Sequence, residues 1–357
     1  MSTTPPETDL QDLAARIKAW GHELGFQQVG ITGIELEEDE ARLLAWLAQG
    51  RHGEMAYMKR HGTQRSRPAD LFPGTARVIS VRMDYWPPDG MTAEPVLADP
   101  AMAYLSRYAL GRDYHKVLRK RLQKLAERIE RDIGPYLYRA FTDSAPVLEK
   151  ALARNAGLGW IGKHTNLINE RAGSWFFLGE LFTSLPLPVD TPGEDHCGTC
   201  RACLDACPTG AIVAPYSLDA RLCISYLTIE LDGAIPEHLR ALIGNRIYGC
   251  DDCQLVCPWN RFAQASGETD FRVRNGLDAA SLVELFGWDG EEFRRRLQGS
   301  AIYRIGHERW LRNLAVGLGN APTTPEVVAA LDARLDDPSA LVREHVAWAL
   351  AQHRPRR

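Results

Sequence analysis

The position of the cysteines is the feature that most restricts how this 357-residue chain can fold. All eight lie between residues 197 and 257. Residues 197–207 have the spacing C-x2-C-x2-C-x3-C and are followed by Pro208, and residues 250–257 have the spacing C-x2-C-x3-C and are followed by Pro258. The first run is the spacing of bacterial two-cluster ferredoxins, in which the fourth cysteine ligates the other cluster. The chain between residues 197 and 257 is therefore predicted to wrap around two [4Fe–4S] clusters.

The ferredoxin arrangement also assigns each cysteine to a cluster, with the isolated Cys223 completing the second set. Zinc is the alternative, but zinc sites favour paired C-x2-C knuckles around one tetrahedron, which two overlapping runs fit poorly. A disulfide framework suits a small secreted domain rather than a large chain. The predicted ligands of one cluster are Cys197, Cys200, Cys203 and Cys257, and those of the other are Cys207, Cys223, Cys250 and Cys253.

Composition and charge indicate a cytoplasmic globular protein. Apolar residues make up 45% of the chain and charged residues 25%, and no apolar run is long enough to cross a membrane. Residues 1–10 are polar and acidic, which does not predict a secretory signal. The net charge of −4 argues against general binding of polyanions, although residues 104–124 are locally basic. Candidate phosphate contacts are the basic side chains of residues 115–124 with Arg294, Arg295, Arg296 and Arg312.

Three domains are predicted: residues 1–190, the cluster segment 191–265, and an all-helical tail, residues 266–357. The first domain alternates helical and strand patterns, which is typical of an α+β or α/β fold. The tail has three short amphipathic helices, predicted at 309–318, 324–335 and 340–352, and we interpret them as HEAT-like repeats, with a plain helical bundle as the alternative. In the first domain we expect helices at 10–24, 41–47, 115–133 and 145–155, strands at 26–31, 77–83, 136–141 and 174–182, and a loop at 86–100.

Two motifs in the first domain match known sites incompletely. Residues 157–163 fit both G-x-G-x-x-G and G-x4-G-K, but a predicted helix rather than a strand precedes them and His164 follows. We therefore predict a glycine-rich loop that can approach another large cofactor closely, not a nicotinamide or P-loop site. Residues 113–115 begin like the cobalt-ligating motif D-x-H-x-x-G, but Leu118 replaces the glycine, so His115 is predicted to be a first-turn helix residue.

Asp143 is the candidate catalytic residue, in the sequence Thr-Asp-Ser-Ala-Pro of residues 142–146. It could serve as the N-cap of the helix predicted at 145–155. The alternative is a proton donor at a strand-to-helix junction, with a pKa raised by nearby aromatic residues such as Phe141, Trp160 or those of the run 175–177.

Several of these motifs, in this order, resemble the epoxyqueuosine reductase family. The resemblance rests on Asp-Ser-Ala-Pro at 143–146 with Glu149, on residues 156–163 and 165–168, and on Gly-Ser-Trp-Phe-Phe-Leu-Gly-Glu at 173–180. It extends to residues 107–115, to the cysteine set and to residues 223–230, and covers about residues 10–350. It implies a cobalamin-dependent enzyme that reduces epoxyqueuosine to queuosine in the anticodon loop of tRNA. The clusters would pass electrons to cobalt, which no protein histidine ligates, and the resulting Co(I) would open the epoxide.

The resemblance also implies roles for individual residues. The family's proton donor corresponds to Asp143, and an external low-potential electron donor is expected, with no membrane partner and a monomeric state. Some relatives carry cysteine at the position of Ser106. The implied cobalamin contacts are Arg67, Ser106, Asp143, Gly157, Gly159, Gly162, Lys163, Thr165, Asn166, Leu167, Ile168, Ser225, Tyr226, Thr228 and Glu230.

Two other functions share part of this sequence pattern. A cobalamin-dependent reductive dehalogenase would act on a small organohalide, but such enzymes usually carry a twin-arginine export signal and lack a helical repeat tail. A non-catalytic electron-transfer protein would need little more than the cluster segment, so the 190 residues before it would require a separate explanation. Cobalt content separates this last function from the enzyme.

Overall fold

The computed structural model describes residues 7–354, so most of the polar N-terminal segment at residues 1–10 lies outside it. Within the described residues, no helix is both long and apolar enough to span a membrane. The first domain contains α1 (Glu7–Glu23), β1 (Gln28–Thr32), α2 (Glu37–Ala48), α3 (Tyr57–Arg60), η1 (Gly62–Arg65), α4 (Pro68–Leu71), β2 (Arg77–Asp84), α5 (Ala93–Ala98), β3 (Tyr104–Leu105), η2 (Arg107–Ala109), α6 (Tyr114–Ile133), β4 (Tyr138–Phe141), α7 (Glu149–Asn155), β5 (Trp160–Ile161), β6 (Leu167–Ile168) and β7 (Phe176–Thr183).

A four-stranded sheet organises this domain, with strand order β1-β2-β7-β4. Every neighbouring pair is antiparallel. The longest ladder joins β2 to β7, with Ser80 opposite Glu180. An antiparallel sheet between helices makes the domain α+β rather than α/β. The site therefore cannot be located by the rule that places ligands at the carboxyl ends of parallel strands.

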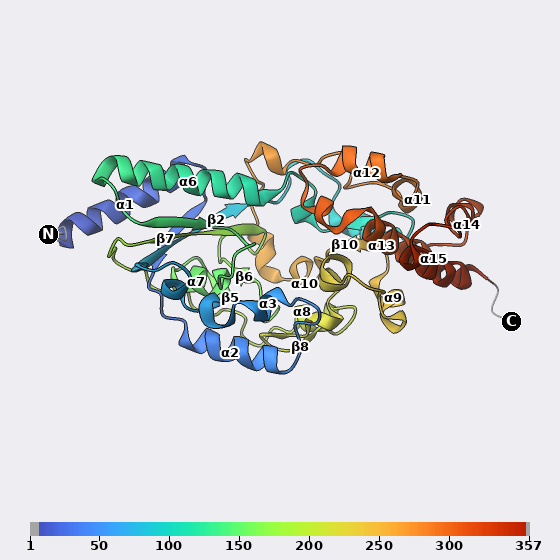
Figure 1. Cartoon of the computed structure of the whole chain (residues 1–357), viewed down its shortest axis with the longest axis horizontal. Helices are drawn as coiled ribbons and strands as arrows, with labels where there is room; N and C mark the ends of the chain where they lie inside the picture. The colour runs from blue at the N-terminus through green and yellow to red at the C-terminus, as the bar shows by residue number, and fades with distance from the viewer. Residues whose placement is uncertain (1–6, 355–357) are drawn as a thin grey trace.

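Helices cover both faces of this sheet, as Figure 1 shows. On one face α1 and α6 bury Ile17, Leu118 and Leu122 against Val81 and Leu181. On the other face α7 packs its Leu152 with Val78, Phe141 and Phe182. Since side chains alternate along a strand, β2 and β7 each supply residues to both cores. The sheet thus has two buried faces.

Two local predictions in this domain are wrong. The helix predicted at 145–155 begins only at Glu149, and Leu148 is its N-cap without a side-chain hydrogen bond. The loop predicted at 86–100 contains the short helix α5. In the first case Pro146 lies before the helix rather than in its first turn, because residues 142–148 form a separate loop that carries Asp143.

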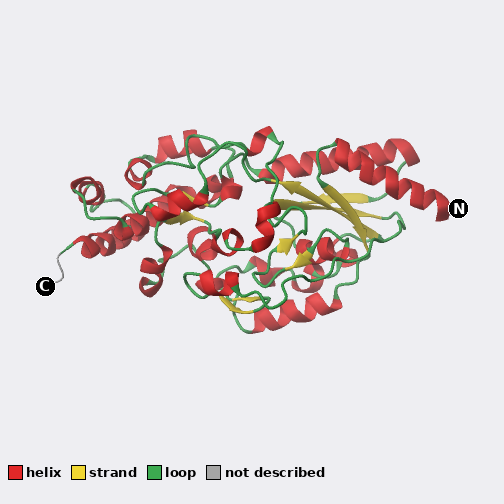
Figure 2. Cartoon of the chain, turned by 180° about the vertical axis from the view of Figure 1, so that it is seen from behind, coloured by secondary structure: helices red, strands yellow, loops and turns green. Residues whose placement is uncertain are grey.

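The cluster segment and the tail pack as one body with part of the first domain (Figures 1 and 2). Strand β10 pairs in parallel with β3 of the first domain. One hydrophobic core contains Leu105 of the first predicted domain, Tyr248 of the cluster segment, and Trp310 and Val346 of the tail. The division into three domains at residues 190 and 265 stays a prediction. The elements are α8 (Ala202–Ala206), β8 (Ile212–Ala214), β9 (Ser217–Leu218), η3 (Ala220–Leu222), the π-helix η4 (Tyr226–Glu230), α9 (Glu237–Ile243), β10 (Arg246–Tyr248), α10 (Asp252–Leu255), η5 (Pro258–Phe262), η6 (Thr269–Phe271), α11 (Leu282–Phe286), α12 (Gly290–Leu297), η7 (Ala301–Ile305), α13 (Gly306–Asn320), α14 (Pro325–Asp332) and α15 (Ala340–His353).

The prediction that Arg312 contacts phosphate is wrong. Its side chain is fully buried on α13. The guanidinium donates to the carbonyl oxygens of Leu227 (2.9 Å), Leu231 (2.7 Å) and Gly233 (2.7 Å), at the carboxyl end of the π-helix. These carbonyls lack helical partners, and a buried cation with several donors satisfies them. Arg312 therefore anchors the cluster segment to the tail.

We expect Arg312→Ala to destabilise the protein by about 3 kcal/mol or more, because buried carbonyl groups would lose charged hydrogen-bond donors. The exposed Arg294 on α12 provides a matched control, since Arg294→Ala should change stability by no more than about 0.5 kcal/mol. Denaturant unfolding of both variants measures the difference. Equal stabilities would contradict the anchoring role.

Candidate active site

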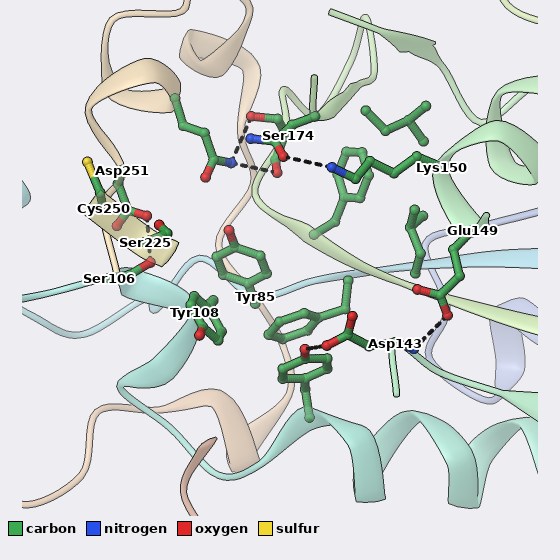
Figure 3. A pocket seen from close by; sticks show the side chains of 17 residues that line it. Tyr85, Ser106, Tyr108, Asp143, Glu149, Lys150, Ser174, Ser225, Cys250 and Asp251 are labelled. Atoms are coloured by element: carbon green, nitrogen blue, oxygen red, sulfur yellow. Dashed lines mark hydrogen bonds between the residues drawn. The ribbon is translucent and has the colours of Figure 1, made fainter. Parts of the chain in front are cut away.

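A solvent-accessible cavity of about 290 Å³ lies where the first domain meets the cluster segment. Figure 3 shows Asp143, Glu149 and Lys150 on one side and Ser106, Ser225, Cys250 and Asp251 on the other. Because one wall comes from the sheet domain and the other from the cysteine loop, the cavity joins the two predicted functional regions. The residues that line it are Tyr85, Ser106, Tyr108, Tyr114, Asp143, Glu149, Lys150, Asn166, Leu167, Ser174, Phe176, Phe177, Leu178, Ser225, Cys250, Asp251 and Gln254.

Asp143 is held in the cavity wall by side chains from the start of α6. The Tyr114 hydroxyl donates to its Oδ2, and His115 Nε2 lies 3.2 Å from the same oxygen. His115 is in turn oriented by Asp113, whose Oδ1 lies 2.7 Å from Nδ1. The backbone of Asp143 has φ +51°, in the left-handed region that Asp tolerates better than most residues. Asp143 is therefore not a helix cap, and the N-cap alternative is wrong.

The pKa of Asp143 is lowered and the pKa of His115 is raised, so both side chains favour their charged forms. The low-polarity surroundings of Asp143 disfavour its charged form, although 57% of its side chain is accessible from the cavity. Hydrogen bonds from His115 and Tyr114 outweigh that effect and hold the pKa of Asp143 below its ordinary value. Burial likewise opposes the charged form of His115, but its hydrogen bonds to Asp113 and Asp143 raise the pKa of His115 to about 9. The prediction that aromatic neighbours raise the pKa of Asp143 is therefore wrong.

The pKa of Glu149 shifts in the opposite direction to that of Asp143. Its Oε1 accepts a hydrogen bond of 2.6 Å from the backbone N–H of Asp143. Burial, followed by the negative charge of Asp143, raises the pKa of Glu149 to about 8. The neighbouring Lys150 points elsewhere, donating to the carbonyl oxygen of Thr165 at 2.9 Å. Two carboxyl groups with opposite pKa shifts thus lie side by side in the cavity wall, a pattern typical of acid–base sites.

The cysteine loop is tied to the other wall through Asp251. Its carboxylate accepts hydrogen bonds from Tyr104 (2.7 Å), from the Ser106 hydroxyl (2.6 Å) and from the backbone of Arg107 (2.8 Å). Gly249 allows this close approach, because a Cβ there would lie 2.6 Å from Cβ of Ser106. Ser106 therefore connects the cavity to the loop that carries Cys250.

The predicted cobalamin contacts divide into two groups. Ser106, Asp143, Asn166, Leu167 and Ser225 line the cavity. The others lie behind it or away from it. Gly157, Gly159, Gly162 and Ile168 support the β5–β6 hairpin, Thr165 lies at its tip, Lys163 donates to the carbonyl oxygens of Gly198 and Cys200, and Tyr226 and Thr228 are buried in the π-helix.

Arg67 and Glu230 are the two predicted contacts that form ion pairs. Arg67 is exposed at the start of α4, where it pairs with Glu40 at 2.8 Å. Glu230, at the end of the π-helix, pairs with Arg304 of η7. The positive charge of Arg304 also contributes to the lowered pKa of Asp143, so the helical tail approaches the site. Neither residue lines the cavity.

Sequence reasoning missed several cavity residues. Tyr85, Tyr108, Ser174, Asp251 and Gln254 were not predicted to belong to a site. Tyr85 follows β2 and Gln254 lies in α10, so their sequence positions carry no common signal. For Tyr114 and His115 the sequence did contain a signal, the incomplete cobalt-ligating motif at residues 113–115. The spacing of that motif also allows the carboxylate of Asp113 to pair with the imidazole of His115.

The four cysteines of the first predicted set lie around one small space, whereas the assignment of all eight cysteines to two clusters stays a prediction. Cys197, Cys200, Cys203 and Cys257 line one small cavity of about 30 Å³, roofed by Trp259. Of the other set, Cys250 lines the active-site cavity, and burial is the main cause that raises the pKa of Cys253. Within residues 7–354 no three His, Cys, Asp or Glu side chains converge on one metal ion.

Two family models match the chain. The model described as epoxyqueuosine reductase QueG, DUF1730, matches residues 65–144. The model described as a 4Fe-4S double cluster binding domain matches residues 196–260, which include all eight cysteines. The matches cover the wall that carries Asp143 and the loop that carries Cys250.

Whole-chain comparisons agree with these models. An epoxyqueuosine reductase of Xanthomonas campestris is 64% identical over 99% of both chains, and that of Escherichia coli is 59% identical over 98% of this chain and 92% of its own. A crystal structure of epoxyqueuosine reductase with an epoxyqueuosine-modified tRNA-Tyr stem loop has a TM-score of 0.87 at 27% identity, covering 96% of this chain and 90% of that one. This chain belongs to the epoxyqueuosine reductase family.

Proposed function

We propose that this protein reduces epoxyqueuosine to queuosine in tRNA, with cobalamin and two [4Fe–4S] clusters as cofactors and with Asp143 as a proton donor. The observation that carries the proposal is the cavity itself, which has an acid–base wall and a cysteine-bearing wall within one site. Family membership at 64% identity over the whole chain supplies the substrate. The crystallised relative bound to a modified tRNA stem loop supports tRNA rather than a free nucleoside as the form that binds.

The cavity fits a corrin in the chemistry of its lining. Tyr85, Tyr108 and Phe176 offer aromatic surfaces, while Asn166, Ser174 and Ser225 offer groups that can bond amide side chains. When bound, cobalamin supplies a strongly reducing, nucleophilic metal centre for opening the epoxide. Cys250 in the lining supports delivery of electrons from the second cysteine set.

Side chains of this protein supply the proton that carbon–oxygen bond cleavage requires. Cleavage of a carbon–oxygen bond leaves negative charge on oxygen, which a positioned acid must neutralise. Asp143 faces the cavity and receives hydrogen bonds from Tyr114 and His115, so His115 can return a proton to it between turnovers. A relative from Bacillus subtilis has been crystallised with its catalytic aspartate loop swung out of the active site. Asp143 of this chain also lies in a loop, residues 142–148 before α7.

The tRNA surface is proposed to begin at the exposed basic face of α6. Tyr114 at the start of this helix lines the cavity, and Arg119 reaches Ser144 beside Asp143 at 3.4 Å. Lys116, Arg119 and Lys120 are exposed around it. Two of the other predicted phosphate contacts already form ion pairs within the protein, Arg121 with Glu268 and Arg295 with Glu292.

Changing Lys116, Arg119 and Lys120 together to Glu should weaken tRNA binding and flatten its salt dependence, because fewer counterions are released from phosphate. The slope of log K against log salt should fall by about 2, at ~0.7–0.9 per lost contact. The same reversal at the exposed Arg42, Arg131 and Arg171 controls for the change in net charge. Filter binding at several salt concentrations measures both triple variants, and equal slopes would place the RNA elsewhere.

The decisive test of the proposed function is anaerobic reconstitution with iron, sulfide and cobalamin. The reconstituted protein is incubated with a low-potential reductant and with tRNA that carries epoxyqueuosine, and the nucleosides are analysed by mass spectrometry. We expect queuosine to form, dependent on cobalamin. Cobalt bound without conversion of the nucleoside would favour reduction of another substrate, and failure to bind cobalt would favour an electron-transfer protein.

A further inference from the structure

Reduction of an epoxide to an alkene requires two protons, and the site contains a second acid that the proposed function does not use. The change converts one epoxide oxygen, two electrons and two protons into a carbon–carbon double bond and water. One proton is taken up when the first carbon–oxygen bond breaks and leaves a hydroxyl group. The other is taken up when that hydroxyl leaves as water, so both protons reach the same oxygen.

We propose that Glu149 is the donor of one of these two protons, acting on the same oxygen as Asp143. Its side chain lines the cavity beside Asp143, and its Oε1 lies 2.6 Å from the backbone nitrogen of that residue. Within the described residues Glu149 forms no ion pair, whereas Asp143 contacts His115. The proposal rests on the proposed function, because it needs a substrate that consumes two protons.

The contacts of Asp143 and Glu149 explain why the two carboxyl groups differ in protonation. Asp143 receives hydrogen bonds from Tyr114 and His115, which stabilise its charged form. Glu149 is bonded through one oxygen to a neutral N–H group, and Lys150 donates to the Thr165 carbonyl instead of to Glu149. A carboxyl group surrounded by protein without a paired cation keeps its proton. Glu149 therefore holds a proton at neutral pH, while Asp143 must be loaded through His115.

Surrounding charges bear on how Glu149 titrates. Burial and the charge of Asp143 raise its pKa to about 8, opposed by its bond to the Asp143 backbone and by the charges of His115 and Lys150. The groups that interact with it electrostatically are Asp143 and Lys150 beside it in the chain, His115 and Tyr114 on α6, Arg65 on η1 and Glu180 on β7. The proton on Glu149 is therefore present below about pH 8 and is lost as the pH rises through that value.

The alternative is that Glu149 only fixes the backbone of the Asp143 loop. Glu149→Gln separates the two roles, because its amide oxygen can still accept the Asp143 N–H but its side chain cannot donate a proton as an acid. If Glu149 is a proton donor, single-turnover conversion should slow by about 10²–10⁴-fold. The fall in kcat/KM of the wild type above about pH 8 should also move to about pH 9 in the variant, where His115 loses its proton. Glu170→Gln, at an exposed carboxyl elsewhere, controls for the replacement of a carboxyl group by an amide.

A second measurement does not depend on turnover. Infrared difference spectra of the wild type should show a neutral carboxyl band at pH 7 that titrates away at higher pH. The band component that titrates near pH 8 should be missing in Glu149→Gln, whereas the buried Glu180, whose pKa is raised well above its ordinary value, should keep its proton in both proteins. In Asp143→Asn that component should persist but titrate at lower pH, because the charge that raises the pKa of Glu149 is gone.

Normal rates and an unchanged pH profile in Glu149→Gln would overturn the inference, as would an ionised Glu149 at pH 7 in the infrared titration. These failures differ from failure of the proposed function. If the wild-type protein itself leaves epoxyqueuosine unchanged, the substrate is wrong, and the infrared titration still decides whether Glu149 holds a proton.

Discussion

Asp143→Asn should slow turnover by about 10²–10⁴-fold while leaving the fold, both clusters and cobalamin in place. A general acid contributes a factor of that size, and an amide cannot donate a proton at neutral pH. Asn is the best-matched substitution, because it tolerates the left-handed backbone at φ +51° and its amide oxygen can still accept from Tyr114. Single-turnover conversion of epoxyqueuosine in tRNA, followed by mass spectrometry, measures the loss.

Asp143→Ala and Asp143→Ser test the same role with different side effects. Ala is less tolerant of the left-handed backbone, at a cost of roughly 1–2 kcal/mol, so some loss of stability is expected from it. Since Asp143 does not cap α7, the Ser variant should gain no stability from a capping hydroxyl. All three variants should fold and bind cobalamin but turn over slowly. Near-normal activity in Asp143→Asn would exclude Asp143 as the proton donor.

Cys200→Ala should abolish turnover by a physiological electron donor and remove about half of the bound iron. Cys200 is exposed and lines the first cysteine cavity, whereas Cys250 of the second set lines the active-site cavity. The first cluster is therefore positioned to receive electrons at the surface and the second to pass them inward. Because Cys200 does not line the active-site cavity, binding of cobalamin there should survive. Iron analysis, visible spectra and turnover assays measure the three effects.

The adjacent Thr199 provides a control for the cysteine substitution. It is exposed in the same loop, so Thr199→Ala should keep the full iron content and activity. Lys163 donates to the carbonyl oxygens of Gly198 (2.5 Å) and Cys200 (2.9 Å), so the loop keeps its backbone anchor when the thiol alone is removed. Normal turnover by Cys200→Ala would show that electrons reach the cavity without the first cluster.

Local signals allowed much of this protein to be predicted. The cysteine spacing predicted a first set of Cys197, Cys200, Cys203 and Cys257, and these four line one small cavity in the structure. The second set stays a prediction. Periodicity located the long helix at 114–133 and the strands at 77–84 and 176–183 within one or two residues. Hydrophobic spacing is a property of the chain itself, and strong patterns survive folding.

Strand order and the cavity were decided by tertiary structure. The antiparallel order β1-β2-β7-β4 depends on pairings between strands far apart in the chain, which local patterns do not specify. Arg312 had the sequence features of a surface cation, yet packing placed it against the free carbonyl groups of a π-helix.

The protonation states of Asp143 and Glu149 also could not be predicted from the sequence. Asp143 was predicted to have a raised pKa, but contact with His115 and Tyr114 lowers it, while Glu149 takes the raised value. Glu149 was visible as part of a family motif, without a role. The sequence by itself determined which chemical groups are available and which neighbours along the chain they have. Only the fold brought α6, the loop 142–148 and the cysteine segment around one cavity, and electrostatic energies depend on those distances through space rather than on separation along the chain.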